Sequence, residues 1–257
     1  MTRLTDAFKN KKAFIPFVTA GDPDLSTTEA LIYAMEEAGA SVIELGIPFS
    51  DPVAEGPVIQ EADNRALAAG FRIDALFDLL EKVRETTEIP LVFLTYANPI
   101  FTYGREAFFT RCAKSGIDGV IVPDVPFEER QTLLPFAQEK GIALISLIAP
   151  SSHERVQMLA REAEGYIYLV SSMGVTGVRE KITTDLKEIV AKIREVSNQP
   201  IAVGFGIARP EQAAQMAAIS DGAIVGSAIV KLAAKYGKKS VGPIRDYVRS
   251  MVEAVKA

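Results

Sequence analysis

A glutamate at position 44 interrupts a short apolar run, residues 42–45, whose composition is typical of a buried β-strand. Burying a carboxylate costs free energy unless the group faces a polar site or has a partner, and burial raises its pKa. A strand-borne glutamate beside an open site can therefore act as a general acid or base. A structural ion pair inside the fold would explain the same pattern, so both interpretations of Glu44 stay open.

Two further carboxylates, Asp51 and Glu55, lie in the proline-rich segment 48–57. Prolines restrict the backbone, so this segment is stiffer than an ordinary linker and can hold a side chain in place. One of the two carboxylates is a candidate to face Glu44. Most loop carboxylates are simply solvated, and that alternative applies to each of them.

Small residues follow three later apolar runs, in the segments 174–177, 204–206 and 226–227. Glycines leave backbone amides unhindered, and Ser227 begins the pattern of a short helix, whose N-terminus attracts anions. These segments contain no lysine or arginine, so oriented N–H groups would bind the anion. The sequence thus predicts a phosphate site, although glycines that only form tight turns would look the same.

Several kinds of chemistry are disfavoured by what the sequence lacks. His153 is the only histidine, and no set of histidine, cysteine and carboxylate residues has the spacing of a metal site. The apolar runs contain no lysine for a Schiff base, and there is no nucleophile triad, P-loop or dinucleotide-binding glycine motif. We therefore expect neither metal nor cofactor, and carboxylate chemistry on a small phosphorylated substrate.

These candidates all stand where an apolar run passes into the next loop, so the fold must bring such ends together. Eight β-rich runs alternate with longer helical patterns, at residues 14–19, 41–45, 91–95, 119–122, 143–148, 166–171, 201–203 and 223–225. Repeated βα units without a linker predict an α/β fold, one closed (β/α)8 TIM barrel over residues 1–257, rather than an open doubly wound sheet. The active site of such a barrel lies at the C-terminal ends of its strands.

Local signals mark several helix ends. Gly39, Gly116 and Gly141 stand where helices would end, because glycine readily adopts the left-handed conformation of a C-terminal cap. Residues 26–29, Ser-Thr-Thr-Glu, have the pattern of a capping box that opens a helix. A short extra helix around residues 5–8 is expected to cover the bottom of the barrel.

Composition limits the partners and the location. A net charge of -5 and a pI near 5.2, with no basic stripe, disfavour nucleic acid as a partner. The chain has no apolar run of the ~18 residues that a membrane span needs, and its N-terminus is polar. Cys112, the single cysteine, lies in a helical pattern over 105–115, where a packed thiol is expected. A lone cysteine fits a reducing compartment, so we expect a cytoplasmic protein.

Longer motifs run in order along nearly the whole chain. The most specific is residues 44–60, which begin Glu-Leu-Gly-Ile-Pro-Phe-Ser-Asp-Pro and end Gly-Pro-Val-Ile-Gln. Supporting motifs occupy residues 17–23, 123–126, 174–177 and 203–206. In these motifs the sequence resembles the alpha subunits of tryptophan synthase. The resemblance implies retro-aldol cleavage of indole-3-glycerol phosphate to indole and glyceraldehyde 3-phosphate.

The resemblance also implies roles for individual residues. Glu44 would be the principal acid and base, and Glu55 would accept the indole N–H as positive charge develops there. Asp124 would support the site. Further residues would border the site or hold the indole ring and the phosphate: Tyr168, Phe17, Leu94, Thr176, Gly177, Gly204, Phe205, Gly206, Gly226 and Ser227.

A partner is implied as well. Alpha subunits pair with a beta subunit in an alpha2beta2 complex, and pyridoxal phosphate belongs to beta. Segments 48–55 and 98–101 would lie at that contact, and segment 171–179 would order over the substrate as a lid. Binding of beta would raise the turnover of this subunit.

One position departs from the family pattern. The family ordinarily has aspartate where this chain has Glu55. The extra methylene moves the carboxylate by about 1 Å unless the loop compensates, and a misplacement of that size can cost ~100-fold in rate. Three interpretations remain: a tolerated variant, a shifted role, or a weak regulatory subunit that mainly activates beta. Another phosphate-binding barrel, such as an isomerase, would share the glycine segments but would not explain residues 44–60.

Overall fold

The computed structural model describes residues 2–256 except residues 151, 172–185 and 205. Its strands are β1 (Ala13–Thr19), β2 (Ile43–Gly46), β3 (Leu91–Leu94), β4 (Gly119–Ile121), β5 (Ala143–Leu144), β6 (Ser146–Ile148), β7 (Ile167–Val170), β8 (Ile201–Gly204) and β9 (Gly222–Val225). Its helices are α1 (Arg3–Ala7), α2 (Leu25–Glu37), α3 (Pro57–Ala68), α4 (Ile73–Val83), α5 (Ala97–Tyr103), α6 (Arg105–Lys114), α7 (Leu134–Glu139), α8 (His153–Arg161), α9 (Leu186–Arg194), α10 (Pro210–Ile219), α11 (Ser227–Tyr236) and α12 (Val241–Lys256), with 3-10 turns at Phe127–Thr132 and Gly237–Lys239.

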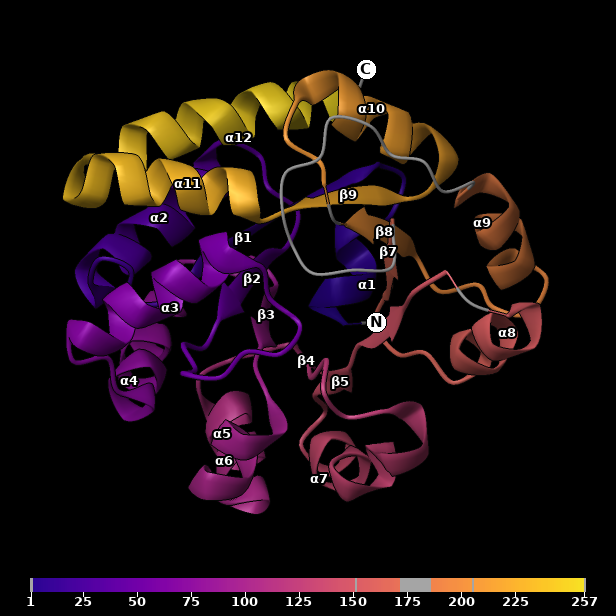
Figure 1. The fold of residues 1–257 in the computed structure, drawn as a ribbon, viewed down its shortest axis with the longest axis horizontal. Helices are drawn as coiled ribbons and strands as arrows, with labels where there is room; N and C mark the ends of the chain where they lie inside the picture. The colour runs from indigo at the N-terminus through magenta and orange to yellow at the C-terminus, as the bar shows by residue number, and fades with distance from the viewer. Residues whose placement is uncertain (1, 151, 172–185, 205, 257) are drawn as a thin grey trace.

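The strands form one parallel sheet that closes on itself. Their order is β5-β4-β3-β2-β1-β9-β8-β7-β6, and β5 and β6 belong to the single predicted run 143–148, interrupted at Ile145. The first half of this run pairs with β4 and the second half with β7. Strands in a barrel are staggered, so the two ends of one strand can bond to neighbours over different lengths. The predicted (β/α)8 barrel is confirmed, and Figure 1 shows its ring of strands inside a ring of helices.

Side chains alternate between the inside and the outside of the ring. On β7, Tyr168 and Val170 belong to the cluster that fills the barrel, whereas Ile167 and Leu169 pack with the cluster between strands and helices. Successive residues of a strand point to opposite faces, and both faces of a barrel strand are covered. A charged side chain at an inward position therefore points either into the barrel interior or toward the open end of the barrel.

The predicted N-terminal helix is confirmed as α1. Its Leu4 and Ala7, together with the following Phe8, are buried and join the cluster inside the barrel. The ring of Phe8 lies 5.7 Å from the ring of Tyr166, centroid to centroid. In Figure 1 this helix is seen at the centre of the ring of strands. Helix α1 thus closes one end of the barrel.

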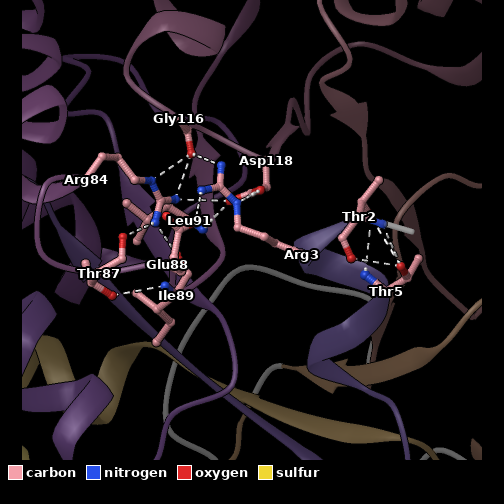
Figure 2. A network of polar contacts seen from close by, with 10 residues as sticks. All are labelled: Thr2, Arg3, Thr5, Arg84, Thr87, Glu88, Ile89, Leu91, Gly116 and Asp118. Atoms are coloured by element: carbon pink, nitrogen blue, oxygen red, sulfur yellow. Dashed lines mark hydrogen bonds and ion pairs between the residues drawn. The ribbon is translucent and has the colours of Figure 1, made fainter.

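A polar network fastens this closed end (Figure 2). Arg3 Nε lies 2.8 Å from Asp118 Oδ1, and Arg84 Nη2 lies 3.1 Å from Asp118 Oδ2. Both guanidinium groups also donate to the Gly116 carbonyl, and the Leu91 amide donates to Asp118 Oδ2 at 2.9 Å. Leu91 begins β3 and Asp118 precedes β4. The network therefore joins α1 to the N-terminal ends of the strands and leaves the opposite end open.

The glycines predicted at helix ends adopt the expected conformation. The φ angles of Gly39, Gly116 and Gly141 are 94°, 71° and 70°. Each is the second residue after the end of a helix. Positive φ is strained for residues with a side chain, which explains glycine at these ends. Cys112 is fully buried in α6, as predicted for a packed thiol.

The predicted capping box at residues 26–29 is wrong. Helix α2 begins at Leu25, and the cap is Asp24, whose carboxylate accepts a hydrogen bond from the Thr27 amide at 2.7 Å. The hydroxyl of Ser26 donates to the same carboxylate at 2.9 Å. An aspartate at this position places a full negative charge at the positive end of the helix dipole, so it competes well with serine.

Within the described ranges, no helix is long and apolar enough to cross a membrane.

Candidate active site

A cavity opens at the C-terminal ends of the strands, opposite α1. It encloses about 650 Å³, counting the space that is open to solvent. Most of the predicted site residues border it, together with apolar side chains from several strands and loops. The described lining residues are Phe17, Glu44, Ala54, Glu55, Ile59, Leu94, Pro123, Leu147, Tyr168, Gly206, Ile207, Ile224, Gly226 and Ser227.

Glu44 projects from β2 into this cavity and is 1% exposed. The Tyr166 hydroxyl donates a hydrogen bond to Glu44 Oε1 at 2.6 Å. Burial raises the pKa of Glu44 to about 8, and the nearby charge of Glu55 adds to this, while the hydrogen bond from Tyr166 opposes it. A carboxyl group with a pKa near neutrality can both donate and accept a proton. The described partner of Glu44 is thus a neutral hydroxyl, which does not favour a structural ion pair.

Glu55 lies near the end of the proline-rich segment between β2 and α3 and is only 4% exposed. Its backbone carbonyl accepts a hydrogen bond from Gln60 Nε2 at 2.8 Å, and the preceding Ala54 amide lies 3.3 Å from the Tyr96 hydroxyl. The side chain lines the same cavity as Glu44. By contrast, Asp51 is exposed and does not line the cavity. Of the two loop carboxylates, therefore, Glu55 is the one that faces Glu44.

An apolar wall surrounds the two carboxylates. Phe17 from β1, Leu94 at the end of β3 and Tyr168 from β7 all line the cavity. Glycines make room for the two rings. A Cβ at Gly46 would lie 2.6 Å from Phe17 Cζ, and a Cβ at Gly204 would lie 2.6 Å from Tyr168 Cε1. Such a wall fits a flat, apolar ring better than a polar sugar.

The predicted phosphate segments lie partly at the cavity. Gly206, Gly226 and Ser227 line it, and Gly226 caps the N-terminus of the ten-residue helix α11. The first amides of a helix have no acceptors within it, so this end can bind an anion. Gly204 is not among the lining residues and instead lies against the ring of Tyr168. Three further predicted residues lie outside the described part of the chain: Thr176, Gly177 and Phe205.

Asp124 lies outside the cavity. It is exposed in the loop after β4. The Ala97 amide donates to its two carboxylate oxygens, at 3.0 and 3.2 Å. Ala97 is the first residue of α5, so the contact joins the loop after β4 to the start of α5. Of the predicted lid 171–179, only Ser171 is described, and it is buried.

Two residues of the site region were missed from the sequence. Tyr166, which binds Glu44, precedes β7 and points inward by the same alternation as Tyr168. Asp63 lies on the inward face of α3 with Ile59 and Ala62 and is 4% exposed. Its signal was present in the sequence, because a charged residue occurs in the apolar stripe of an amphipathic helix.

Metal-binding side chains do not gather in the part of the chain that the structure describes. Among the described residues, no group of three or more histidine, cysteine, aspartate and glutamate side chains could hold a metal ion. The two lining carboxylates, Glu44 and Glu55, stand beside apolar side chains. The cavity thus places two carboxyl groups, which can exchange protons, against an apolar wall.

Comparison with known proteins identifies the family. The family model described as tryptophan synthase alpha chain matches residues 4–255. A tryptophan synthase alpha chain from Lacticaseibacillus casei is 49% identical over 257 residues, which are 100% of this chain and 97% of the relative. This chain belongs to the tryptophan synthase alpha chain family.

Solved structures agree with the family assignment. The tryptophan synthase alpha chain from Legionella pneumophila subsp. pneumophila is 35% identical, with a TM-score of 0.88 over 99% of this chain and 97% of that one. A structure from Pyrococcus furiosus, described as the basis of mutual activation of the tryptophan synthase a2b2 complex, is 32% identical with a TM-score of 0.86, covering 95% and 99%. The alpha chain fold is thus the same barrel.

Proposed function

We propose that this chain cleaves indole-3-glycerol phosphate to indole and glyceraldehyde 3-phosphate, as the alpha subunit of a tryptophan synthase in tryptophan biosynthesis. The observation that carries the proposal is Glu44, a buried carboxyl group with a pKa raised to about 8 that lines an apolar cavity. The chain belongs to the tryptophan synthase alpha chain family, whose lyase reaction needs a group that can donate and accept protons, as this carboxyl group can.

The reaction needs two proton movements. A proton must reach C3 of the indole ring, which makes the ring a leaving group, and the hydroxyl on the attached glycerol carbon must lose its proton to form the aldehyde. The bond between C3 and that carbon then breaks, and its electron pair restores the aromatic indole. Glu44 supplies and removes these protons, because its pKa lies near neutrality.

Glu55 stabilises the charge that develops on the ring. Protonation at C3 makes the indole nitrogen positive, and an ionised carboxylate that accepts its N–H binds this state more tightly than the neutral ring. The burial of Glu55 beside Glu44 supports the role, since a water-poor site strengthens the interaction. Phe17 and Leu94 pack against the ring, and Tyr168 borders the site.

The phosphate of the substrate lies at the N-terminus of α11. Gly226, Ser227 and Gly206 line this end of the cavity and can offer backbone amides and a hydroxyl. We assign Thr176, Gly177 and Phe205 to the same site by the family pattern alone. Gly204 leaves room for the ring of Tyr168. Asp124 supports the site by binding the Ala97 amide at the mouth of the barrel.

The partner is a beta subunit in an alpha2beta2 complex. Two large apolar side chains are exposed in the segments assigned to that contact, Val53 at 73% and Phe101 at 49%. The P. furiosus complex supports the same assembly and mutual activation. This chain needs no cofactor of its own, and pyridoxal phosphate belongs to beta. Neither nucleic acid nor a membrane takes part, and the protein works in the cytoplasm.

The test is indole formation from indole-3-glycerol phosphate by the purified chain, alone and titrated with cognate beta. We expect activity that rises on addition of beta and that Glu44→Gln abolishes. An inactive parent that still raises the serine-dependent activity of beta would instead establish a regulatory subunit. Inactivity in both assays would contradict both roles and would make another phosphorylated substrate the next hypothesis to test.

A further inference from the structure

Tyr96 follows β3 and caps the start of α5, beside the loop that carries Glu55. Its side chain is buried, with the residue 2% exposed, and it is not among the described residues that line the cavity. A buried tyrosine directs its hydroxyl at a hydrogen-bond partner, because an unpaired polar group in the interior costs free energy. The partner of Tyr96 therefore indicates what this hydroxyl does.

The partner of the hydroxyl is the backbone next to Glu55. The Ala54 amide donates a hydrogen bond to the Tyr96 hydroxyl oxygen at 3.3 Å. One residue further on, the Glu55 carbonyl accepts a hydrogen bond from Gln60 Nε2 at 2.8 Å. The backbone is thus held just before and just after the Cα atom of Glu55. Because the allowed side-chain rotamers depend on the backbone angles, a held backbone restricts where the carboxylate can point.

The ring of Tyr96 contacts the other end of the same loop. The rings of Phe49 and Tyr96 lie 5.5 Å apart, centroid to centroid, with planes inclined by 32°. Aromatic pairs at this separation attract each other beyond the area that they bury. Tyr96 thus contacts the loop 49–55 near both of its ends, through the ring at Phe49 and through the hydroxyl at Ala54.

Tyr96 is itself fixed to the barrel on both sides. The preceding Thr95 amide donates to the carbonyl of Ile121, in β4, at 3.0 Å. The following Ala97 amide donates to both carboxylate oxygens of Asp124, in the loop after β4. These contacts give Tyr96 a firm base, so its side chain can hold a neighbouring loop in place.

The hydroxyl of Tyr96 is neutral at neutral pH. Burial, and then the charge of Glu55, raise the pKa of Tyr96 above its ordinary value. A neutral hydroxyl keeps lone pairs for the Ala54 amide and sets no further negative charge beside Glu55. The contact with the loop therefore persists while the Glu55 carboxylate is ionised.

We propose that Tyr96 is a positioning residue for Glu55: its ring and hydroxyl hold the loop 49–55 at Phe49 and Ala54 and so direct the Glu55 carboxylate into the cavity. The consequence for the rate rests on the function proposed above. The holding of the loop does not, because it concerns only contacts within the folded chain.

The test removes the hydroxyl in Tyr96→Phe and the whole ring in Tyr96→Ala. Tyr103→Phe is the matched control, because Tyr103 ends the helix that Tyr96 caps and its hydroxyl donates to Asp74, outside the loop, at 2.6 Å. We expect kcat to fall by about 10-fold in Tyr96→Phe and about 100-fold in Tyr96→Ala, with little change in KM, as for a misplaced transition-state contact. Tyr103→Phe should remain within about 3-fold of the parent. Equal losses in the two phenylalanine variants would overturn the proposal.

A double-mutant cycle with Glu55→Gln separates positioning from a general loss of structure. If Tyr96 acts through Glu55, Tyr96→Phe should lower kcat by less than about 2-fold once the carboxylate is absent. The full 10-fold loss in that background would show that the hydroxyl acts elsewhere, and the proposal would fail. Where Glu55→Gln leaves no measurable rate, hydrogen exchange decides.

Amide hydrogen exchange over residues 49–55 is the readout that needs no activity. Exchange in this loop should be about 10-fold faster in Tyr96→Phe, which loses one hydrogen bond, and unchanged in Tyr103→Phe. Unchanged exchange in Tyr96→Phe would overturn the proposal. If the parent forms no indole, the proposed function fails and exchange alone decides the role of Tyr96. If Tyr96→Ala does not fold, Tyr96→Phe, which keeps the ring, carries the decision.

Discussion

Carboxyl groups at the two ends of this barrel have opposite kinds of partner. At the closed end, Asp118 is bound by the guanidinium groups of Arg3 and Arg84 (Figure 2). At the open end, Glu44 is bound by the neutral hydroxyl of Tyr166, and Asp63 is buried and forms no ion pair with a cation among the described residues. Paired charges can hold a structure together, whereas burial without a cation, and then the charge of Glu55, raise the pKa values of Glu44 and Asp63. We therefore expect the first end to contribute stability and the second to carry out the proposed proton transfer.

The substitution Glu44→Gln, at the open end, should have the largest effect on activity. We expect indole formation to fall by about 10²- to 10⁴-fold, the usual contribution of a general acid or base. The same change removes the cost of a buried carboxyl group, so the variant should unfold at a higher temperature than the parent at pH 8. Steady-state kinetics and thermal unfolding check the two effects. An active variant, or one that loses stability in step with activity, would contradict the contrast.

The substitution Arg84→Ala, at the closed end, should lower stability and leave activity unchanged. The Arg84 side chain is 10% exposed and donates to Asp118 and to the carbonyls of Gly116 and Ile89. Its loss leaves a buried carboxylate with one cation fewer, so we expect the free energy of unfolding to drop by about 3 kcal/mol. The kcat per folded molecule should not change.

Denaturant unfolding beside the control Arg249→Ala measures this effect. Arg249 lies 3.6 Å from Glu37 in an exposed pair, which contributes roughly 0–1 kcal/mol. A drop no larger than that of the control would show that the closed end does not depend on its charges.

Stability at varied pH sharpens the comparison. Burial raises the pKa values of Glu44 and Asp63 to about 8 in the folded protein, whereas they lie near 4 in an unfolded chain. The folded state therefore keeps protons that the unfolded state releases. The free energy of unfolding should then fall as pH rises from about 4 to about 8, by at most about 1.4 kcal/mol per pH unit for each group.

Urea unfolding between pH 5 and pH 8 measures this slope. Glu44→Gln and Asp63→Asn should each flatten the slope, while Arg84→Ala should shift the whole curve without flattening it. Parallel curves for the parent and Glu44→Gln would mean that Glu44 is ionised in the folded protein throughout this range.

The smallest expected effect is that of Glu55→Asp, which restores the residue that the family ordinarily has. The carboxylate retreats by about 1 Å, and the loop is held through Gln60 and Tyr96 in both forms. We expect kcat to be largely kept or raised, within about 10-fold of the parent. A 100-fold loss would show that the cavity of this chain is fitted to glutamate.

Sequence reasoning located most of the candidate site because strand ends converge in a barrel. The position of Glu44 in an apolar strand predicted its burial, and the glycine segments predicted the helix start at Ser227. The same reasoning left Asp51 and Glu55 undecided, since a loop has no periodicity that tells which side chain points inward. It also passed over Asp63, although the helical stripe marked it.

The sequence by itself determined the eight-unit barrel and the family, because these depend on periodicity and motif order, and it predicted carboxylate chemistry from residue type. Only the tertiary structure decided which groups meet. The contact of Tyr166 with Glu44 spans 122 positions, and the split of run 143–148 depends on the closure of the ring. Raised pKa values arise from burial and from neighbours distant in the chain, and no local pattern specifies either.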